Sequence, residues 1–153
     1  METVMNKAYK LFETYLQSQN SRLTNQKKAI LHEIISIKSH FEIDSFITKL
    51  TNKNKDHVIS RATIFRTIKQ LLDAKLIQKI TTRTGKVYYE QTISRDHHAH
   101  LICNSCGKIF EIEDNTIEQQ LNQYAKKLNF SPKYHSIHLY AECNNKQCKH
   151  SKL

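Results

Sequence analysis

Residues 97–113 bring together side chains that bind transition metals, with three imidazoles, two thiols and two carboxylates in seventeen positions. On a β-strand, His98 and His100 would lie on one face, because strand side chains repeat with a period of two. Gly107 stands where a tight turn after the thiols needs a positive φ. Glu111 then falls on the strand expected to run back beside the first. The pattern predicts a hairpin with two metal positions, one of sulfur ligands and one of nitrogen and oxygen ligands.

All four cysteines of the chain occur in two close pairs, Cys103 with Cys106 and Cys143 with Cys148. Zinc prefers four soft ligands in a tetrahedron, and two such pairs brought together by folding supply four thiolates. The alternatives are a redox pair or unrelated buried thiols, but two close pairs that use every cysteine of a chain predicted to be cytosolic favour a metal. A closed four-thiolate site has no open position, so the predicted zinc is structural and contributes to folding.

The nitrogen and oxygen set is His98, His100 and Glu111, with His40 and Glu90 as more distant candidates. Imidazole with carboxylate suits Fe(II), Mn(II) and Zn(II), and the general order of affinities does not choose between them. A further candidate set comprises His97, Glu118 and His135. The remaining histidines are interpreted as ordinary surface residues: His32, His57, His138 and His150.

The charge of the chain is unevenly distributed. The formal net charge is +10 over 153 residues; residues 1–90 contain 16 Lys and Arg against 8 Asp and Glu, whereas residues 91–153 contain 8 against 6. A basic part joined to a nearly neutral part indicates a module that binds a polyanion such as nucleic acid. We find no signal peptide and no stretch long and apolar enough to cross a bilayer, which predicts a cytosolic protein without membrane contact.

The elements that must position these residues are helical in the first part of the chain. Apolar residues at three- to four-residue spacing predict four helices. The first helix is expected at about residues 7–18, and the second begins after an N-cap at Thr24. The third is expected at about residues 42–52 and is followed by a loop over residues 51–57. The fourth begins after an N-cap at Ser60 and covers residues 61–74. The apolar residues of the fourth helix are Ala62, Phe65, Ile68, Leu71 and Leu72. Its start combines small, hydroxylated and basic residues, as recognition helices do.

Short β-branched and aromatic runs follow the helices, at residues 76–82 and 86–91 around Gly85, and predict a hairpin. Helices followed by such a hairpin make a winged helix-turn-helix arrangement. Beyond a short polar stretch at residues 92–96, the metal-binding hairpin is followed by a helix at about residues 116–128 and a strand at residues 135–143. This second part reads as a small α+β unit.

These residues resemble the ferric uptake regulator (Fur) family of metal-dependent bacterial repressors. The family's histidine-rich strand, which runs into H-L-I-C-x-x-C-G-K-I, is matched by residues 97–109. Its A-T-V-Y-R-x-L recognition helix is similar to residues 62–68, and its L-T-x-x-R segment to residues 23–27. His40 falls where the N-terminal ligand of the family lies. The resemblance extends from about residue 21 to residue 148.

The resemblance implies an α+β fold with a winged-helix DNA-binding domain over residues 1–91, a hinge over 92–96 and a dimerisation and metal-binding domain with antiparallel strands over 97–153. It implies a homodimeric repressor on a palindromic double-stranded operator, with no enzymatic activity and no small-molecule substrate. The four cysteines would hold structural Zn(II). Regulatory Fe(II), or Mn(II) or Zn(II), would be bound by His40, Glu90, His98, His100 and Glu111. The DNA contacts would come from Lys27, Arg61, Thr63, Phe65, Arg66 and Lys69.

The chain departs from the family pattern at a few positions. Ala99 stands where many relatives have an acidic residue, which removes one ligand from the set of His97, Glu118 and His135. Glu90 lies one residue further from the histidines than in the iron-sensing members. Phe65 replaces a tyrosine and keeps its stacking surface, whereas Lys27 replaces an arginine and loses the bidentate fork.

Two alternatives remain at this point. A peroxide-sensing member of the family also lacks an acid at position 99, but it carries aspartate where Glu111 stands. A zinc-dependent enzyme such as a nucleobase deaminase pairs H-x-E with P-C-x-x-C. Here the corresponding residues are His98-Ala99-His100, and no proline precedes Cys103.

Overall fold

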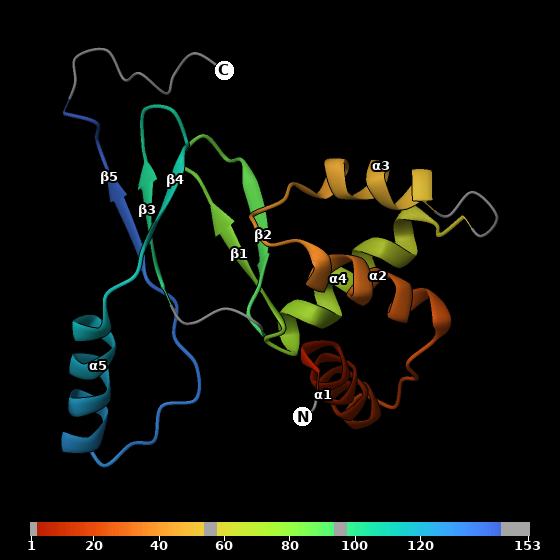
Figure 1. The fold of residues 1–153 in the computed structure, drawn as a ribbon, viewed down its shortest axis with the longest axis horizontal. Helices are drawn as coiled ribbons and strands as arrows, with labels where there is room; N and C mark the ends of the chain where they lie inside the picture. Colours follow the sequence, from red (N-terminus) through yellow and green to blue (C-terminus); the bar gives the residue numbers. More distant parts are fainter. Residues whose placement is uncertain (1–2, 54–57, 94–97, 145–153) are drawn as a thin grey trace. The chain divides into compact units, whose positions relative to one another are not determined.

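The computed structural model describes residues 3–53, 58–93 and 98–144, and Figure 1 shows the elements that they form. Along the chain these are α1 (Val4–Ser18), α2 (Asn25–Ser36), α3 (Ile43–Lys53), α4 (Arg61–Asp73), β1 (Ile77–Thr81), β2 (Val87–Gln91), β3 (Ala99–Cys103), β4 (Ile109–Ile112), α5 (Asn115–Lys127) and β5 (His138–Ala141). They belong to two compact units, Met1–Thr81 with Val87–Arg95, and Thr82–Lys86 with Asp96–Leu153. Within the described ranges, every helix is too short or too polar to span a bilayer.

Side-chain caps begin three helices of the first unit. Thr24 and Ser60 act as predicted, each accepting the backbone N–H three residues further on, at 3.3 and 3.2 Å. Thr3 caps α1 in the same way, so this helix begins at Val4 and not near residue 7. Each cap satisfies an N–H that the first helical turn leaves without a helical partner, which is why these positions start helices.

The third helix is longer than predicted at its end. It runs to Lys53, so the loop predicted for residues 51–57 is wrong for 51–53, and residues 54–57 lie outside the described part of the chain. Thr51 donates its hydroxyl to the carbonyl of Ile47 at 2.9 Å. This bond lets a polar, β-branched residue continue the last turn of the helix.

The buried face of α4 is rotated from the predicted one. Ala62 and Phe65 are exposed, with 46% of Phe65 accessible to solvent, and the buried residues are Ile64, Thr67, Ile68 and Leu71. Thr67 is compatible with the core because its hydroxyl donates to the carbonyl of Thr63 at 2.8 Å. The prediction of Ala62 and Phe65 as core residues is therefore wrong, and both lie on the outer surface of α4.

A two-stranded hairpin follows α4, as predicted for the wing. β1 and β2 pair antiparallel, from Ile77 with Gln91 to Thr81 with Val87. Gly85 stands in the turn between them with φ of +84°, a conformation that glycine adopts without strain. Ile77 joins the apolar core formed by the four helices. The first unit is thus a winged helix with one core.

The second unit contains a three-stranded sheet in the order β4-β3-β5 (Figure 1). β3 and β4 form the predicted antiparallel hairpin, with Gly107 at φ of +72° in its turn. β5, however, pairs parallel to β3, so the prediction of an antiparallel sheet is wrong for this strand. β4 carries the chain back to the end of the sheet where β3 starts, and the connection through α5 begins and ends there, so β5 runs parallel to β3. β5 is also shorter than the predicted strand, residues 135–143, because its partner β3 ends at Cys103.

Candidate functional site

His40 is held beside strand β2 by the residue that follows it. Phe41 and Tyr89 form a backbone bridge in which each N–H donates to the carbonyl of the other, at 2.9 and 2.8 Å. His40 is thereby placed next to Glu90, and His40 Nε2 lies 3.5 Å from Glu90 Oε2. Glu90 is buried, and a buried carboxylate requires hydrogen bonds or a cation to replace its hydration. A divalent ion is a cation that both side chains could bind.

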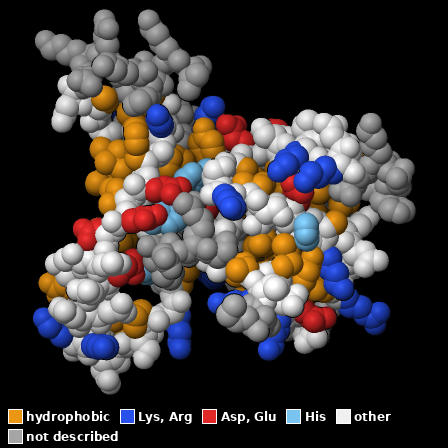
Figure 2. Space-filling model, in the orientation of Figure 1, with side chains coloured by type: hydrophobic (Ala, Val, Ile, Leu, Met, Phe, Trp, Pro, Cys, Tyr) orange, Lys and Arg blue, Asp and Glu red, His pale blue; other side chains and the backbone are white. Residues whose placement is uncertain are grey.

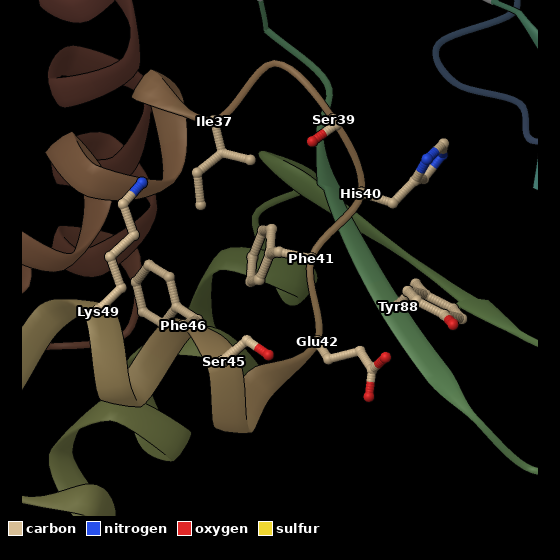
Figure 3. A pocket seen from close by; sticks show the side chains of 9 residues that line it. All are labelled: Ile37, Ser39, His40, Phe41, Glu42, Ser45, Phe46, Lys49 and Tyr88. Atoms are coloured by element: carbon tan, nitrogen blue, oxygen red, sulfur yellow. The ribbon is translucent and has the colours of Figure 1, made fainter. Parts of the chain in front are cut away.

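A pocket of about 330 Å³ opens beside His40 within the first unit. Figure 3 shows His40 and Phe41 pointing to opposite sides of the segment that carries them. The Phe41 ring packs on Phe46, with ring centroids 5.2 Å apart, while Glu42 and Tyr88 line the same pocket. The apolar contact anchors the segment, and the His40 side chain, which is 15% exposed, points away from that contact.

The imidazoles of the second unit lie at and beside the start of β3. His98 precedes the strand and His100 lies within it, and their ring centroids are 4.7 Å apart. Each offers a ring nitrogen within 4.8 Å of the other. Glu111 on β4 is the direct cross-strand partner of His100, so the two side chains share a face of the sheet. The predicted hairpin and the shared face of the two histidines are confirmed.

His138 joins this group, so the prediction that it is an ordinary surface residue is wrong. It is the register partner of His100 on β5, is half-buried, and its ring centroid lies 5.5 Å from that of His100. Burial lowers the pKa of His138, and the neighbouring His100 lowers it further, which favours the neutral imidazole. The alternation around residue 138 is visible in the sequence, but the strand that β5 pairs with is not.

The cysteines gather at one end of the sheet in the second unit. Cys103 ends β3, Cys106 stands in the turn after it, and Cys143 comes two positions beyond the last residue of β5, Ala141. Cys103 and Ala141 are register partners of parallel strands, so both strands deliver their cysteines in the same direction. Cys148 lies outside the described residues. The four-thiolate zinc site stays a prediction, supported by this placement of three thiols.

The further candidate set is brought together only in part. His135 Nε2 lies 2.8 Å from Glu118 Oε1, within the second unit. His97 lies outside the described residues, and Ala99 contributes a buried methyl group in place of a ligand. The described part of this set therefore offers one imidazole and one carboxylate.

The basic residues of α2 and α4 approach each other in the first unit. Lys27 Nζ donates to Ser21 Oγ at 2.9 Å and to the carbonyl of Arg22 at 3.1 Å. Burial lowers the pKa of Lys27, and the charge of Arg66 lowers it further. Two cations from different helices are thus held where they repel each other, and a bound anion such as a phosphate would relieve that repulsion.

The other candidate DNA contacts lie around the start of α4. Arg61 forms an exposed ion pair with Asp44 at 2.8 Å, and its guanidinium carbon lies 5.9 Å from the centre of the Phe65 ring. The Thr63 hydroxyl lies 2.9 Å from that of Ser60, and Lys69 is exposed. Figure 2 shows Lys and Arg side chains projecting from the visible face of the first unit. Charge, hydroxyl and aromatic groups are therefore offered on one helix.

Comparison with known proteins decides the family. The model of the ferric uptake regulator family matches residues 18–140 of this sequence. The chain belongs to that family. The ferric uptake regulation protein of Campylobacter jejuni subsp. jejuni is 29% identical over 141 residues, which cover 90% of this chain and 89% of that protein.

Solved structures of Fur proteins have the same fold. The regulator from Francisella tularensis with iron is 26% identical and covers 80% of this chain and 92% of its own, with a TM-score of 0.57. The regulator from Pseudomonas aeruginosa with manganese is 20% identical and covers 86% and 97%, with a TM-score of 0.71, and shows the fold alone.

Membership in the Fur family makes this chain a metal-responsive transcription regulator. The zinc-enzyme alternative is thereby excluded, because Fur proteins are transcription regulators and not enzymes.

Proposed function

We propose that this protein is an Fe(II)-responsive, dimeric repressor whose regulatory ion is bound by residues of both units. The proposed ligands are His40, Glu90, His98, His100 and Glu111. The observation that carries the proposal is that each unit places a histidine next to a glutamate: His40 Nε2 lies 3.5 Å from Glu90 Oε2, and His100 is the cross-strand partner of Glu111. This donor set suits Fe(II), Mn(II) and Zn(II), and the Francisella relative has been solved with iron.

The donor sets explain how a metal could control DNA binding. Neither unit alone supplies the five ligands named above, so an ion binds best when residues of both units contribute. Such an ion can act only through its differential affinity for two arrangements of the units. His40 and Glu90 on the winged helix, and the histidines of β3, would then select the arrangement that fits the operator.

Operator recognition is assigned to α4 and to the start of α2. Lys27, Arg61, Arg66 and Lys69 would meet phosphates or guanine, because guanidinium and ammonium groups bind both. Thr63 and the exposed Phe65 would contact base edges, the ring meeting a thymine methyl group. Phe65 is exposed, and this supports the assignment, because a ring buried in the core could not contact a base.

The second unit is proposed to pair with its copy and to hold structural Zn(II). α5 has no buried residue, although Leu121, Tyr124 and Leu128 recur on one stripe, and Phe110 and Leu139 of the sheet are exposed as well. Apolar surface of this kind marks an interaction site. The zinc would be bound by Cys103, Cys106, Cys143 and Cys148. It would stabilise the fold and take no part in metal sensing, because a closed site leaves no open position.

The test is operator binding by His98→Ala, titrated with Fe(II), Mn(II) and Zn(II). We expect the variant to remain a folded dimer, because the four-cysteine site is intact, and to lose metal-dependent binding. His32→Ala removes an exposed histidine of α2 and serves as the matched control. A His98→Ala protein that still bound its operator only with metal would contradict the assignment. The titrations of the parent protein show which of the three ions support operator binding.

A further inference from the structure

A row of side chains with metal-binding groups crosses all three strands of the second unit. His100, on the middle strand, pairs with Glu111 of β4 on one side and with His138 of β5 on the other. Directly paired residues of neighbouring strands point to the same face, and the strands lie about 4.8 Å apart. His138 therefore holds on β5 the position that Glu111 holds on β4.

Two neighbouring pairs of these imidazoles, His98 with His100 and His100 with His138, have ring spacings compatible with binding one ion. Metal–nitrogen bonds of about 2.0–2.1 Å place the ring centroids of two imidazoles on one ion roughly 4.5–5.5 Å apart. The observed centroid distances are 4.7 Å between His98 and His100 and 5.5 Å between His100 and His138. The rings are inclined to each other by 65° and 75°, so they are not stacked face to face.

We propose that His138 is an additional ligand of the regulatory ion and that it favours nitrogen-preferring ions, Fe(II), Co(II) and Zn(II), over Mn(II). The inference rests on the proposed regulatory site, because His98 and His100, together with His40 of the first unit, supply its other imidazoles. Mn(II) stands lowest in the general order of affinities and is well served by carboxylate and water. A further imidazole in place of a water ligand therefore strengthens binding of the other ions more than binding of Mn(II).

The Ser136 hydroxyl is placed to orient His138. Ser136 Oγ lies 3.1 Å from His138 Nε2. When His138 binds an ion through Nδ1, its Nε2–H donates to this hydroxyl. Ligating histidines commonly make such a second bond, which fixes the tautomer and the ring orientation.

The experiment compares metal affinities of the full chain with its structural zinc retained. His138→Ala, His98→Ala and the control His32→Ala are titrated with Co(II), followed by its visible absorption, and with Mn(II), followed by electron paramagnetic resonance. We expect His138→Ala to lose at least about tenfold in Co(II) affinity, to change in Co(II) spectrum, and to lose much less for Mn(II). His138→Gln keeps the side-chain size and replaces the alanine variant if circular dichroism shows that the latter is unfolded.

The outcomes separate this inference from the proposed function. If His98→Ala loses both ions while His138→Ala binds both as the parent does, His138 is not a ligand and the regulatory site stands. An equal loss of Co(II) and Mn(II) in His138→Ala overturns the selectivity. If His98→Ala binds both ions unchanged, the regulatory site itself is wrong, and the inference falls with it.

Discussion

Gln78 donates its side-chain amide to the carboxylate of Glu90, with Nε2 and Oε2 3.0 Å apart. The two residues are direct register partners in the β1–β2 hairpin, so strand pairing itself brings the amide to the acid. The same Glu90 oxygen lies 3.5 Å from His40 Nε2. Gln78 therefore orients a proposed metal ligand without being one, and the pairing of the wing strands contributes to the geometry of the proposed regulatory site.

We expect Gln78→Leu to weaken binding of the regulatory ion by about 10–100-fold, the usual effect of losing an outer partner of a ligand. Leucine has a similar size but no donor, so the Glu90 carboxylate loses the bond that holds it in place. The measurement is a calorimetric Co(II) titration of the zinc-loaded protein. Lys79→Leu is the matched control, because Lys79 is the next residue of β1 and is exposed. Equal Co(II) affinities of Gln78→Leu and the parent would mean that Glu90 is positioned without the amide.

Lys27 provides a test of the DNA interface. Its ammonium lies near Arg66, and burial and that charge lower its pKa. If both bind phosphate, Lys27→Ala weakens binding to operator and to unrelated DNA by a similar factor, and reduces the slope of log affinity against log salt by about one. Fluorescence anisotropy at several salt concentrations measures this slope.

Lys10→Ala, on the exposed side of α1, is the control for a general loss of positive charge. It should leave the slope as it is in the parent. A Lys27→Ala protein that lost affinity for the operator alone, with an unchanged slope, would show that Lys27 contacts a base and not a phosphate.

Features set by nearby residues could be predicted from the sequence. The caps at Thr24 and Ser60, the wing around Gly85 and the shared face of His98 and His100 each depend on a few neighbouring residues. Their physical causes, a side-chain oxygen facing a free N–H, a glycine at positive φ and the period of a strand, act locally. These parts of the fold and of the candidate site were accordingly predicted at the right residues.

Features set by distant partners could not be predicted in the same way. The parallel pairing of β5 with β3, and with it the position of His138 beside His100, depends on which edge of the β3–β4 hairpin the chain reaches after α5. The exposure of Phe65 likewise depends on which side of α4 packs against the other helices. Thr67, and not Phe65, lies on the buried side. The alternation at residue 138 and the apolar character of Phe65 carry no information about these partners.

Substitution of a zinc-binding cysteine is expected to unfold the second unit, whereas substitution of a regulatory histidine is expected to remove only the response to metal. Cys103→Ser should release zinc and unfold the second unit, because binding of a structural zinc contributes on the order of 10 kcal/mol to folding. The winged helix should stay folded, since its core contains no residue of β3, β4, β5 or α5. Zinc content measured by mass spectrometry and amide spectra measured by nuclear magnetic resonance separate the two effects. A zinc-free variant with both units folded would contradict the structural role.

Glu33 on α2 should make the stability of the winged helix depend on pH. Its buried carboxylate accepts hydrogen bonds from Lys49 and Lys53 of α3, both at 2.8 Å. Burial acts to raise the pKa of Glu33, but the hydrogen bonds and charges of the two lysines outweigh it, so the pKa lies below its ordinary value. We expect Glu33→Gln to lower the free energy of unfolding at neutral pH by roughly 1–3 kcal/mol. Because both ammonium groups are about half exposed, salt should reduce this difference.

The sign of the pH dependence follows from the direction of that pKa. The folded protein holds the Glu33 proton less tightly than the unfolded chain, whose carboxyl has a pKa of about 4.3. The stabilisation is therefore fully present above that pH and is lost as the pH falls through the lower pKa of the folded state. Urea unfolding of the parent and of Glu33→Gln should give stabilities that differ at pH 7 and converge in acid. Glu13→Gln, an exposed acid of α1, should show no such convergence, and a Glu33→Gln deficit that persisted unchanged in acid would assign the effect to packing and not to charge.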